Sequence, residues 1–283
     1  MLEARHITLR YGARLAVDAV SLGVPLGRVV ALCGPNGAGK SSLLSALCGD
    51  ATPSAGEVHL SGAPLSALTI AELARARAVL EQSPSLSVAF TARELAMLGV
   101  PDEISLPEAE VICAGVLADL DLTRLEDRPV PQLSGGERHR AHLARVLAQL
   151  RAGRMRGFGL YLMLDEPTAS LDIQHQIAVM QQARKAAEEG SGVIVVLHDL
   201  NLACAFADRV VLMRDGRIAV DGPPEEVLTS RILSDVYETA ITVVPGPDGR
   251  PRIFPDYTSA KEHSAHVHRN EPFPRAAGSG GRV

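Results

Sequence analysis

The chain has 283 residues, of which 46% are hydrophobic, and a formal net charge of −5, which together indicate a globular protein long enough to bury a core. Only 3% of the residues are aromatic, none is tryptophan and no long basic stripe occurs, so the composition argues against nucleic acid as a partner. The four cysteines are widely spaced without a C-x-x-C pair, and we expect them to be reduced and mostly buried.

The apolar runs of the sequence have the length of strands. The two best candidates for a longer segment, G-L-Y-L-M-L and G-V-I-V-V-L, fall far short of the ~18–20 residues that a membrane-spanning helix needs. The first residues, M-L-E-A-R-H, lack the charged and then apolar pattern of a signal peptide. We therefore expect a cytoplasmic protein without a membrane span.

The first part of the chain combines strands with two helices. Residues 1–32 contain short apolar runs broken by Gly and Pro, a pattern typical of β-rich segments. A helix is predicted after Gly39, with its end near Gly49. The next predicted elements are a strand at 57–62, a helix at 70–77 and a strand at 78–82 that runs into a loop.

From about residue 91 to residue 150 the pattern becomes helical, because apolar residues recur at spacings of three and four. Residues 151–159 are basic and glycine-rich, which predicts a loop. Two buried strands follow, one before Asp165 and one before His198, with a helix between them. A strand, helix and strand with continuous apolar strands predict a parallel sheet covered on both faces, and hence an α/β fold.

The C-terminal part begins with a predicted hairpin at 209–222 that turns at Asp215-Gly216, and a short helix P-P-E-E-V-L follows it. After about Asp256 the sequence is polar and rich in Gly, His and Arg, and we expect disorder there. The three histidines of this tail, His263, His266 and His268, are expected to be incidental. We place a domain at residues 1–245 and an extension at 246–283.

A glycine-rich loop connects the strand R-V-V-A-L-C to the helix that follows it. Its sequence G-P-N-G-A-G-K-S fits the pattern G-x-x-x-x-G-K-[ST] in the strand-to-helix context that the pattern requires. Backbone N–H groups of such a loop and a lysine ammonium bind the phosphates of a nucleotide, and the serine hydroxyl ligates Mg²⁺. The predicted phosphate-binding residues are Gly34, Pro35, Asn36, Gly37, Ala38, Gly39, Lys40, Ser41 and Ser42.

Two carboxylates stand at the end of the strand L-Y-L-M-L, where the parallel sheets of α/β proteins bind ligands. We expect Asp165 to hold Mg²⁺ and Glu166 to polarise the attacking water. A second candidate phosphate site is the segment L-S-G-G-E, in which Ser134 can cap a helix and Gly135 and Gly136 leave N–H groups exposed. Alone, this turn would more often be an ordinary helix cap.

The order of these motifs resembles the nucleotide-binding subunit of ATP-binding-cassette (ABC) transporters over roughly residues 1–245. The resemblance implies an α/β fold with a mainly parallel sheet flanked by helices, an N-terminal antiparallel β subdomain and an inserted helical subdomain at about 91–150. The matching features, in chain order, are Tyr11, the glycine loop at 34–42, Gln82, L-S-G-G-E at 133–137, the strand end at 162–166, S-L-D at 170–172 and His198.

The resemblance also implies a role for each position. Tyr11 would stack on adenine, although an ordinary surface tyrosine is the alternative. Gln82 would contact Mg²⁺ or the lytic water, and His198 would contact the γ-phosphate and align Glu166. Ser134, Gly135 and Gly136 would grip the γ-phosphate of an ATP molecule held by a second copy of the chain. Asp172 would pair across this dimer.

Within the family, A-R-A-R-A-V-L-E-Q, V-L-H-D-L-N-L-A and the extra loop before the acidic strand resemble ATPases of iron-chelate importers, and most closely those that import haem. The resemblance implies transmembrane permease subunits, a periplasmic haem-binding protein as an indirect partner, and a peripheral location on the cytoplasmic face of the inner membrane. The alternatives are siderophore or cobalamin import, a soluble ATPase of the iron–sulfur assembly type, and a regulatory module that does not hydrolyse ATP.

Overall fold

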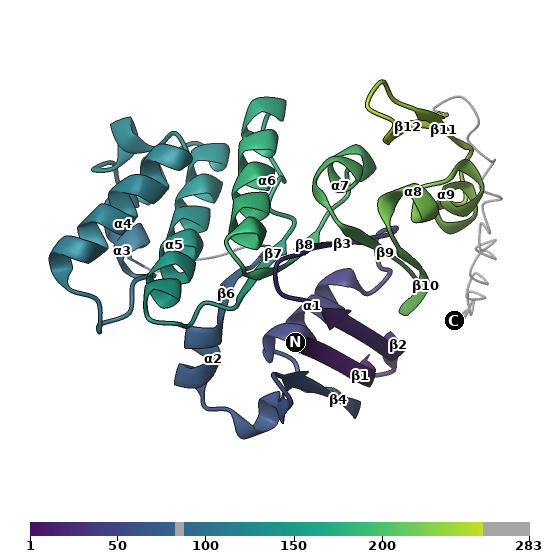
Figure 1. The fold of residues 1–283 in the computed structure, drawn as a ribbon, viewed down its shortest axis with the longest axis horizontal. Coiled ribbons are helices and arrows are strands. Elements are labelled where there is room, and N and C mark those ends of the chain that lie inside the picture. The colour runs from purple at the N-terminus through teal and green to yellow at the C-terminus, as the bar shows by residue number, and fades with distance from the viewer. Residues whose placement is uncertain (83–87, 257–283) are drawn as a thin grey trace, which may run out of the picture.

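The computed structural model describes residues 1–82 and 88–256, and its centre is a six-stranded sheet in the order β10-β9-β3-β8-β7-β6 (Figure 1). Strands β9, β3, β8, β7 and β6 pair in parallel, and β10 is antiparallel to β9. The predicted parallel sheet and the hairpin at 209–222 are confirmed. The strands are β3 (Val29–Cys33), β6 (Arg77–Leu80), β7 (Tyr161–Asp165), β8 (Gly192–Val196), β9 (Arg209–Arg214) and β10 (Arg217–Gly222).

Side chains pack against both faces of the central sheet. Along β3, Val29, Ala31 and Cys33 join one apolar cluster, whereas Val30 and Leu32 join the other. Every position of β3, β7 and β8 is buried, which explains why their sequences are continuous apolar runs. Burial of a valine or leucine side chain contributes roughly 1.5–3 kcal/mol, so these strands form a firm base for the loops at their carboxyl ends.

All four cysteines are free and buried, as predicted from their spacing; they are Cys33, Cys48, Cys113 and Cys204. The thiols of Cys33 and Cys48 have a pKa raised to about 12 by burial. A thiol with so high a pKa is a poor nucleophile at neutral pH, since the thiolate is the reactive form. The cysteines therefore act as small apolar side chains of the core.

A second, antiparallel sheet in the order β2-β1-β4-β5 forms the predicted N-terminal β subdomain. Its strands are β1 (Leu2–Tyr11), β2 (Arg14–Val24), β4 (Ala55–Leu60) and β5 (Ala63–Pro64). Helix α1 (Lys40–Cys48) contacts both sheets and buries Leu43 and Leu47 in the cluster between them. The helix ends at Gly49, whose φ of 80° suits glycine and whose N–H bonds back to the last turn.

The helical subdomain forms a group of helices at one side of the molecule (Figure 1). It contains α3 (Ala92–Met97), α4 (Leu106–Asp119) and α5 (Gly135–Met155), whereas the predicted helix at 70–77 is α2 (Ile70–Ala76) beside β6. Helices α3 and α4 both pack on α5. In the described residues, short 3₁₀ helices also lie at Leu65–Ala67, before α2, and at Thr123–Leu125 and Val130–Gln132, between α4 and α5.

The prediction of a loop at 151–159 is wrong for residues 151–155, because α5 continues to Met155. Arg, Ala and Met favour helix, and Gly153 serves a packing purpose: a side chain there would lie 3.2 Å from the backbone nitrogen of Gly159. Beyond the end of the helix, the chain turns at Gly157 and Gly159, which have φ angles of 78° and 71°. In the sequence, a glycine that a helix needs for close packing cannot be distinguished from a glycine in a loop.

In the C-terminal part, helices pack against the inner strands β8, β3 and β9 of the sheet. They are α6 (Ile173–Glu188), α7 (Leu200–Phe206), α8 (Pro224–Val227) and α9 (Ser230–Tyr237). A hairpin of β11 (Ile241–Pro245) and β12 (Pro251–Pro255) follows, so the proposed boundary after residue 245 falls in its turn. Asn201 of α7 holds the hairpin through both backbone groups of Ile253. The predicted disorder and the three tail histidines lie outside the described residues.

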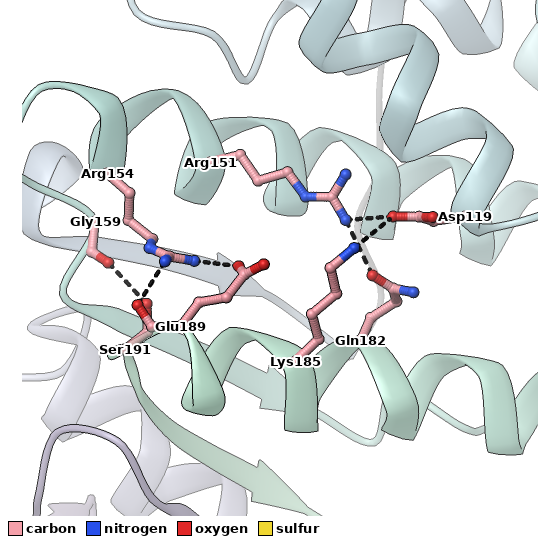
Figure 2. Close-up of polar contacts among 8 residues, drawn as sticks. All are labelled: Asp119, Arg151, Arg154, Gly159, Gln182, Lys185, Glu189 and Ser191. Atoms are coloured by element: carbon pink, nitrogen blue, oxygen red, sulfur yellow. Dashed lines mark hydrogen bonds and ion pairs between the residues drawn. The ribbon is translucent and has the colours of Figure 1, made fainter.

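Two groups of polar contacts join α5 to α6, and Figure 2 shows them side by side. In one group, Arg151 of α5 donates to Asp119 at the end of α4 and to Gln182 of α6, and Lys185 of α6 lies 3.5 Å from the same carboxylate. In the other group, the Arg154 guanidinium pairs with the carboxylate and the carbonyl of Glu189, just beyond the end of α6. Arginine is suited to such multiple contacts because its donors are arranged in a planar fork.

Because α5 contains a buried histidine, we expect the free energy of unfolding to fall at acidic pH. His142 is only 4% exposed, and burial, followed by the charge of Arg145, lowers its pKa to about 4. The unfolded chain takes up this proton below pH ~6.5, whereas the folded chain does so only near pH 4. We expect the free energy of unfolding to fall by about 2 kcal/mol from pH 7.5 to pH 5 through this residue.

Urea unfolding at the two pH values tests this expectation. The variant His142→Gln keeps a polar side chain of similar reach but does not titrate, so its stability should depend less steeply on pH by the same amount. An equal pH dependence in the variant and the wild type would contradict the assignment.

Candidate nucleotide-binding site

A cleft of about 560 Å³ lies at the N-terminal end of α1, beside the carboxyl ends of β6, β7 and β8. Parallel sheets bind ligands at this edge, because the loops that leave their strands meet there. Residues from five separate regions of the sequence line the cleft: Tyr11, Arg14, Ala16, Asn36, Gly37, Gly39, Lys40, Ser41, Ser42, Gln82, Glu166 and His198. Most of the residues predicted for nucleotide binding are therefore brought together.

The glycine loop has a backbone path that only glycine can follow at two positions. Gly34 has a φ of 138°, and a Cβ atom there would lie 2.1 Å from the carbonyl oxygen of Met213 on β9. Gly39 has a φ of 98°, and its Cβ would lie 2.3 Å from the carbonyl oxygen of Ala16 on β2. Both contacts are with backbone, which cannot move aside as a flexible side chain would. The loop therefore packs against the backbone of both sheets, at β9 of the central sheet and at β2 of the antiparallel sheet.

Helix α1 begins without a side-chain cap. Its N-cap residue is Gly39, whereas Thr69, Thr91 and Asp199 accept hydrogen bonds from the first turns of α2, α3 and α7. The first N–H groups of a helix have no partner within the helix, and in α1 no side chain of the N-cap takes them. Together with the positive end of the helix dipole, they form a site for a phosphate group.

Lys40, the first residue of α1, places its ammonium group inside the glycine loop. Its Nζ donates to the carbonyl oxygens of Gly34 at 2.8 Å and Pro35 at 3.0 Å, and the residue is only 5% exposed. Burial lowers the pKa of Lys40, and the carboxylate of Glu166 opposes this effect. An ammonium has three N–H donors, so after these two bonds one is left for a ligand in the cleft.

Ser41 and Asp165 form an oxygen-donor pair next to the lysine. The Ser41 hydroxyl donates to Asp165 Oδ1 at 3.1 Å, and Asp165 is 8% exposed at the end of β7. Burial raises the pKa of Asp165, although the Ser41 hydrogen bond and Lys40 counteract it. Mg²⁺ prefers oxygen ligands and is usually bound by one or two protein groups, phosphate oxygens and several waters. Asp165 offers a carboxylate and Ser41 a hydroxyl for such a site. The residues present therefore fit a magnesium ion.

Glu166 lies at the centre of a polar cluster. Its Oε1 is 2.8 Å from Nε2 of His198, which follows β8, and Gln82, which follows β6, also bonds to it. Burial raises the pKa of Glu166, but the bonds from His198 and Gln82 outweigh it, so the pKa lies below its usual value and the group is a carboxylate at neutral pH. An ionised, oriented carboxylate of this kind can accept a proton from water.

The L-S-G-G-E segment lies outside this cleft. Ser134 caps α5 in a capping box with Glu137, as predicted. Gly136 lies close to Ser170 and Leu171 in the loop between β7 and α6, and Gly135 faces open space, because nothing lies within 4 Å of the position of a Cβ. The structure therefore does not bring this turn to the glycine loop of the same chain.

Asp172 also lies outside the cleft. It is the N-cap of α6 and accepts from the backbone N–H of His175 at 2.9 Å, which lowers its pKa. The nearby Arg140 is 7% exposed, and its Nε and Nη1 have no hydrogen-bond partner within the described structure. Arg140 was not predicted from the sequence, where an arginine on a helix gives no sign of burial.

Comparison with known proteins identifies the family. The family model described as ABC transporter matches residues 17–169, more than half of the chain. Hemin import ATP-binding protein HmuV of Bradyrhizobium diazoefficiens is 44% identical over 268 residues, which cover 94% of this chain and 99% of that protein. HmuV of Thermobifida fusca is 45% identical over 260 residues, which cover 90% and 88% of the two chains. The chain belongs to the ABC transporter family.

Solved structures of ABC ATPases share its fold. A bacterial ABC transporter cassette, solved as a dimer, aligns with a TM-score of 0.70 and 27% identity over 79% of this chain and 99% of that chain. An ATP-binding subunit of an ABC transporter aligns with a TM-score of 0.72 over 84% and 98% of the two chains, at 23% identity. As an ABC subunit of this kind, the chain binds and hydrolyses ATP. Within residues 1–82 and 88–256, no helix is both long and apolar enough to span a membrane.

Arg14 and Ala16 line the cleft of this ABC ATPase, but the sequence did not predict them. Tyr11 and Arg14 face each other across the turn of the β1–β2 hairpin, and a guanidinium nitrogen of Arg14 lies 3.5 Å from the position of a Cβ on Gly37. Tyr11 is 53% exposed and free to contact a ligand. The sequence Y-G-A-R could have indicated this arrangement, because a glycine-containing turn between two strands brings the residues on either side of it together.

Proposed function

We propose that the chain is the ATPase subunit of an importer that takes up haem. The observation that supports this function is the set of curated relatives named as hemin import ATP-binding proteins, which are 40–46% identical over most of the chain. The sequence resemblance to haem importers points the same way. The cargo itself passes through other subunits, so no residue here serves as a haem ligand.

In this function the glycine loop binds the triphosphate of ATP. The open N-terminus of α1 and the buried ammonium of Lys40 supply positive charge to the β- and γ-phosphates. Glu166 accepts a proton from the attacking water, and His198 holds its carboxylate at 2.8 Å. Gln82 contacts the same carboxylate, and we infer that it also contacts the lytic water. Tyr11 stacks on the adenine at the mouth of the cleft.

Mg²⁺ is the proposed cofactor, and Ser41 and Asp165 are its proposed protein ligands. When bound, the ion would neutralise charge on the phosphates of ATP. The fit of these two side chains supports the proposal, since their oxygens lie 3.1 Å apart next to Lys40. Gln82 lines the same cleft and is the third candidate ligand.

A second copy of the chain is the proposed partner. The turn of Ser134, Gly135 and Gly136 does not line the cleft of its own chain, which favours a nucleotide bound by another copy as its ligand. The solved cassette at 27% identity is a dimer. We infer that two chains close on two ATP molecules, that Asp172 pairs across the interface, and that hydrolysis reopens the dimer. Closure and reopening would drive permease subunits from the cytoplasmic face of the inner membrane, to which the chain is bound peripherally.

Reconstitution with the permease tests the proposed cargo. The tagged chain, purified from membranes of its host, should carry with it an apolar multi-helix permease. In proteoliposomes, ATP hydrolysis should rise at least about fivefold when a haem-loaded periplasmic binding protein is added, because coupling free energies between distant sites are typically ~1–3 kcal/mol. Stimulation by a cobalamin- or siderophore-loaded protein instead would overturn the haem assignment. Isolation without any permease would favour a soluble ATPase.

A further inference from the structure

A histidine on α5 contacts the backbone of the loop that follows Glu166. Its Nε2 lies 2.8 Å from the carbonyl oxygen of Pro167. This residue, His139, is half-buried, and burial lowers its pKa, so the ring is neutral at neutral pH. Because a carbonyl oxygen can only accept, the ring carries its proton on Nε2 and donates it to Pro167.

The bonded carbonyl belongs to the residue next to the proposed catalytic carboxylate. Glu166 has a φ of 50°, a left-handed conformation that non-glycine residues keep only where the surroundings hold it. Its own carbonyl oxygen accepts the N–H of Ala169 at 3.1 Å. Pro167 has no N–H group, so its carbonyl is the only backbone group of this residue that can form a hydrogen bond. His139 provides that contact.

Helix α5 holds the same stretch of chain at its other end. The loop after Glu166 leads into α6, and beyond the end of α6 Glu189 pairs with Arg154 of α5, while Gln182 accepts from Arg151 (Figure 2). The segment from Pro167 to Glu189 is thus bound to α5 at both ends. A shift of the N-terminal end of α5 therefore acts on the peptide next to Glu166.

The N-terminal end of α5 is also the L-S-G-G-E turn. Ser134 caps the helix five residues before His139, and Gly136 lies against Ser170 and Leu171 of the loop after Glu166. We propose that His139 is a positioning residue for ATP hydrolysis: its bond to Pro167 aligns the Glu166 carboxylate according to the position of the turn on the same helix. This inference rests on the hydrolytic role proposed for Glu166.

Two amide substitutions separate positioning from packing. In His139→Gln the amide nitrogen can reach the place of Nε2, whereas in His139→Asn it lies nearer the place of Nδ1, which makes no bond to Pro167. We expect His139→Asn to lower kcat for ATP about tenfold with an unchanged KM, since misplacement of a catalytic group by a fraction of an ångström has effects of this order. His139→Gln should keep the kcat of the wild type.

Steady-state ATPase assays on the full-length chain measure both constants, and urea unfolding checks that the variants fold. His6→Asn is the matched control, because His6 is an exposed residue of β1 whose left-handed φ of 49° asparagine tolerates. Unchanged kcat in His139→Asn, or equal loss of kcat in His139→Gln and His139→Asn, would overturn the inference while leaving the proposed function intact. A wild-type chain without turnover would overturn both.

Discussion

Glu166→Gln is expected to lower ATP hydrolysis by about 10³-fold and to leave ATP binding within about twofold of the wild type. Glutamine has the shape of glutamate and can still bond to His198, so the cluster around β7 and β8 should persist. The substitution removes the negative charge and thereby the ability to accept a proton from water. The loss should therefore appear in kcat, not in the dissociation constant of ATP.

Phosphate release and equilibrium binding of a fluorescent ATP analogue measure the two quantities. Glu110→Gln is a useful control, because it removes a negative charge from an exposed residue of α4 that does not line the cleft. It should hydrolyse ATP at the rate of the wild type. A Glu166→Gln variant that retains a tenth or more of the wild-type turnover would show that another group activates the water.

The phosphate-binding half of the cleft could be predicted from sequence because its residues are consecutive. Gly34 to Ser42 lie between an apolar strand and a helix, and a turn that must follow this path needs glycine at fixed spacings. The acidic strand end was predictable for a similar reason. A continuous apolar run places Asp165 at the carboxyl edge of a parallel sheet, which is the edge where Lys40 also lies.

Contacts between distant elements could not be predicted in this way. Arg14 reaches the cleft only because the β1–β2 register places it opposite Tyr11. The left-handed φ of Glu166 and the bond from His139 to Pro167 depend on how α5 packs beside the loop after β7, and neither leaves a pattern in the local sequence. The helical extension to Met155 was missed because Gly153 packs against Gly159, a contact that propensity does not reveal.

Gly39→Ala is expected to weaken ATP binding at least about 100-fold, which corresponds to roughly 3 kcal/mol. A methyl group at this position would lie 2.3 Å from the carbonyl oxygen of Ala16, and the φ of 98° is unfavourable for alanine as well. The backbone must then move away from β2, and the N–H groups at the start of α1 move with it. Binding of a fluorescent ATP analogue measures the effect directly.

The strain of a left-handed alanine can be separated from the displacement of the loop by a matched control. Gly62, between β4 and β5, has a φ of 89°, and nothing lies within 4 Å of the place of its Cβ. Gly62→Ala should therefore carry a similar backbone cost and lower the free energy of unfolding by about 1–2 kcal/mol, yet bind ATP like the wild type. Equal affinities in the two variants would mean that the close approach of Gly39 to β2 is not what holds the phosphate loop in shape. A large loss of affinity in Gly39→Ala alone would attribute the loss to that approach, because backbone strain is common to both.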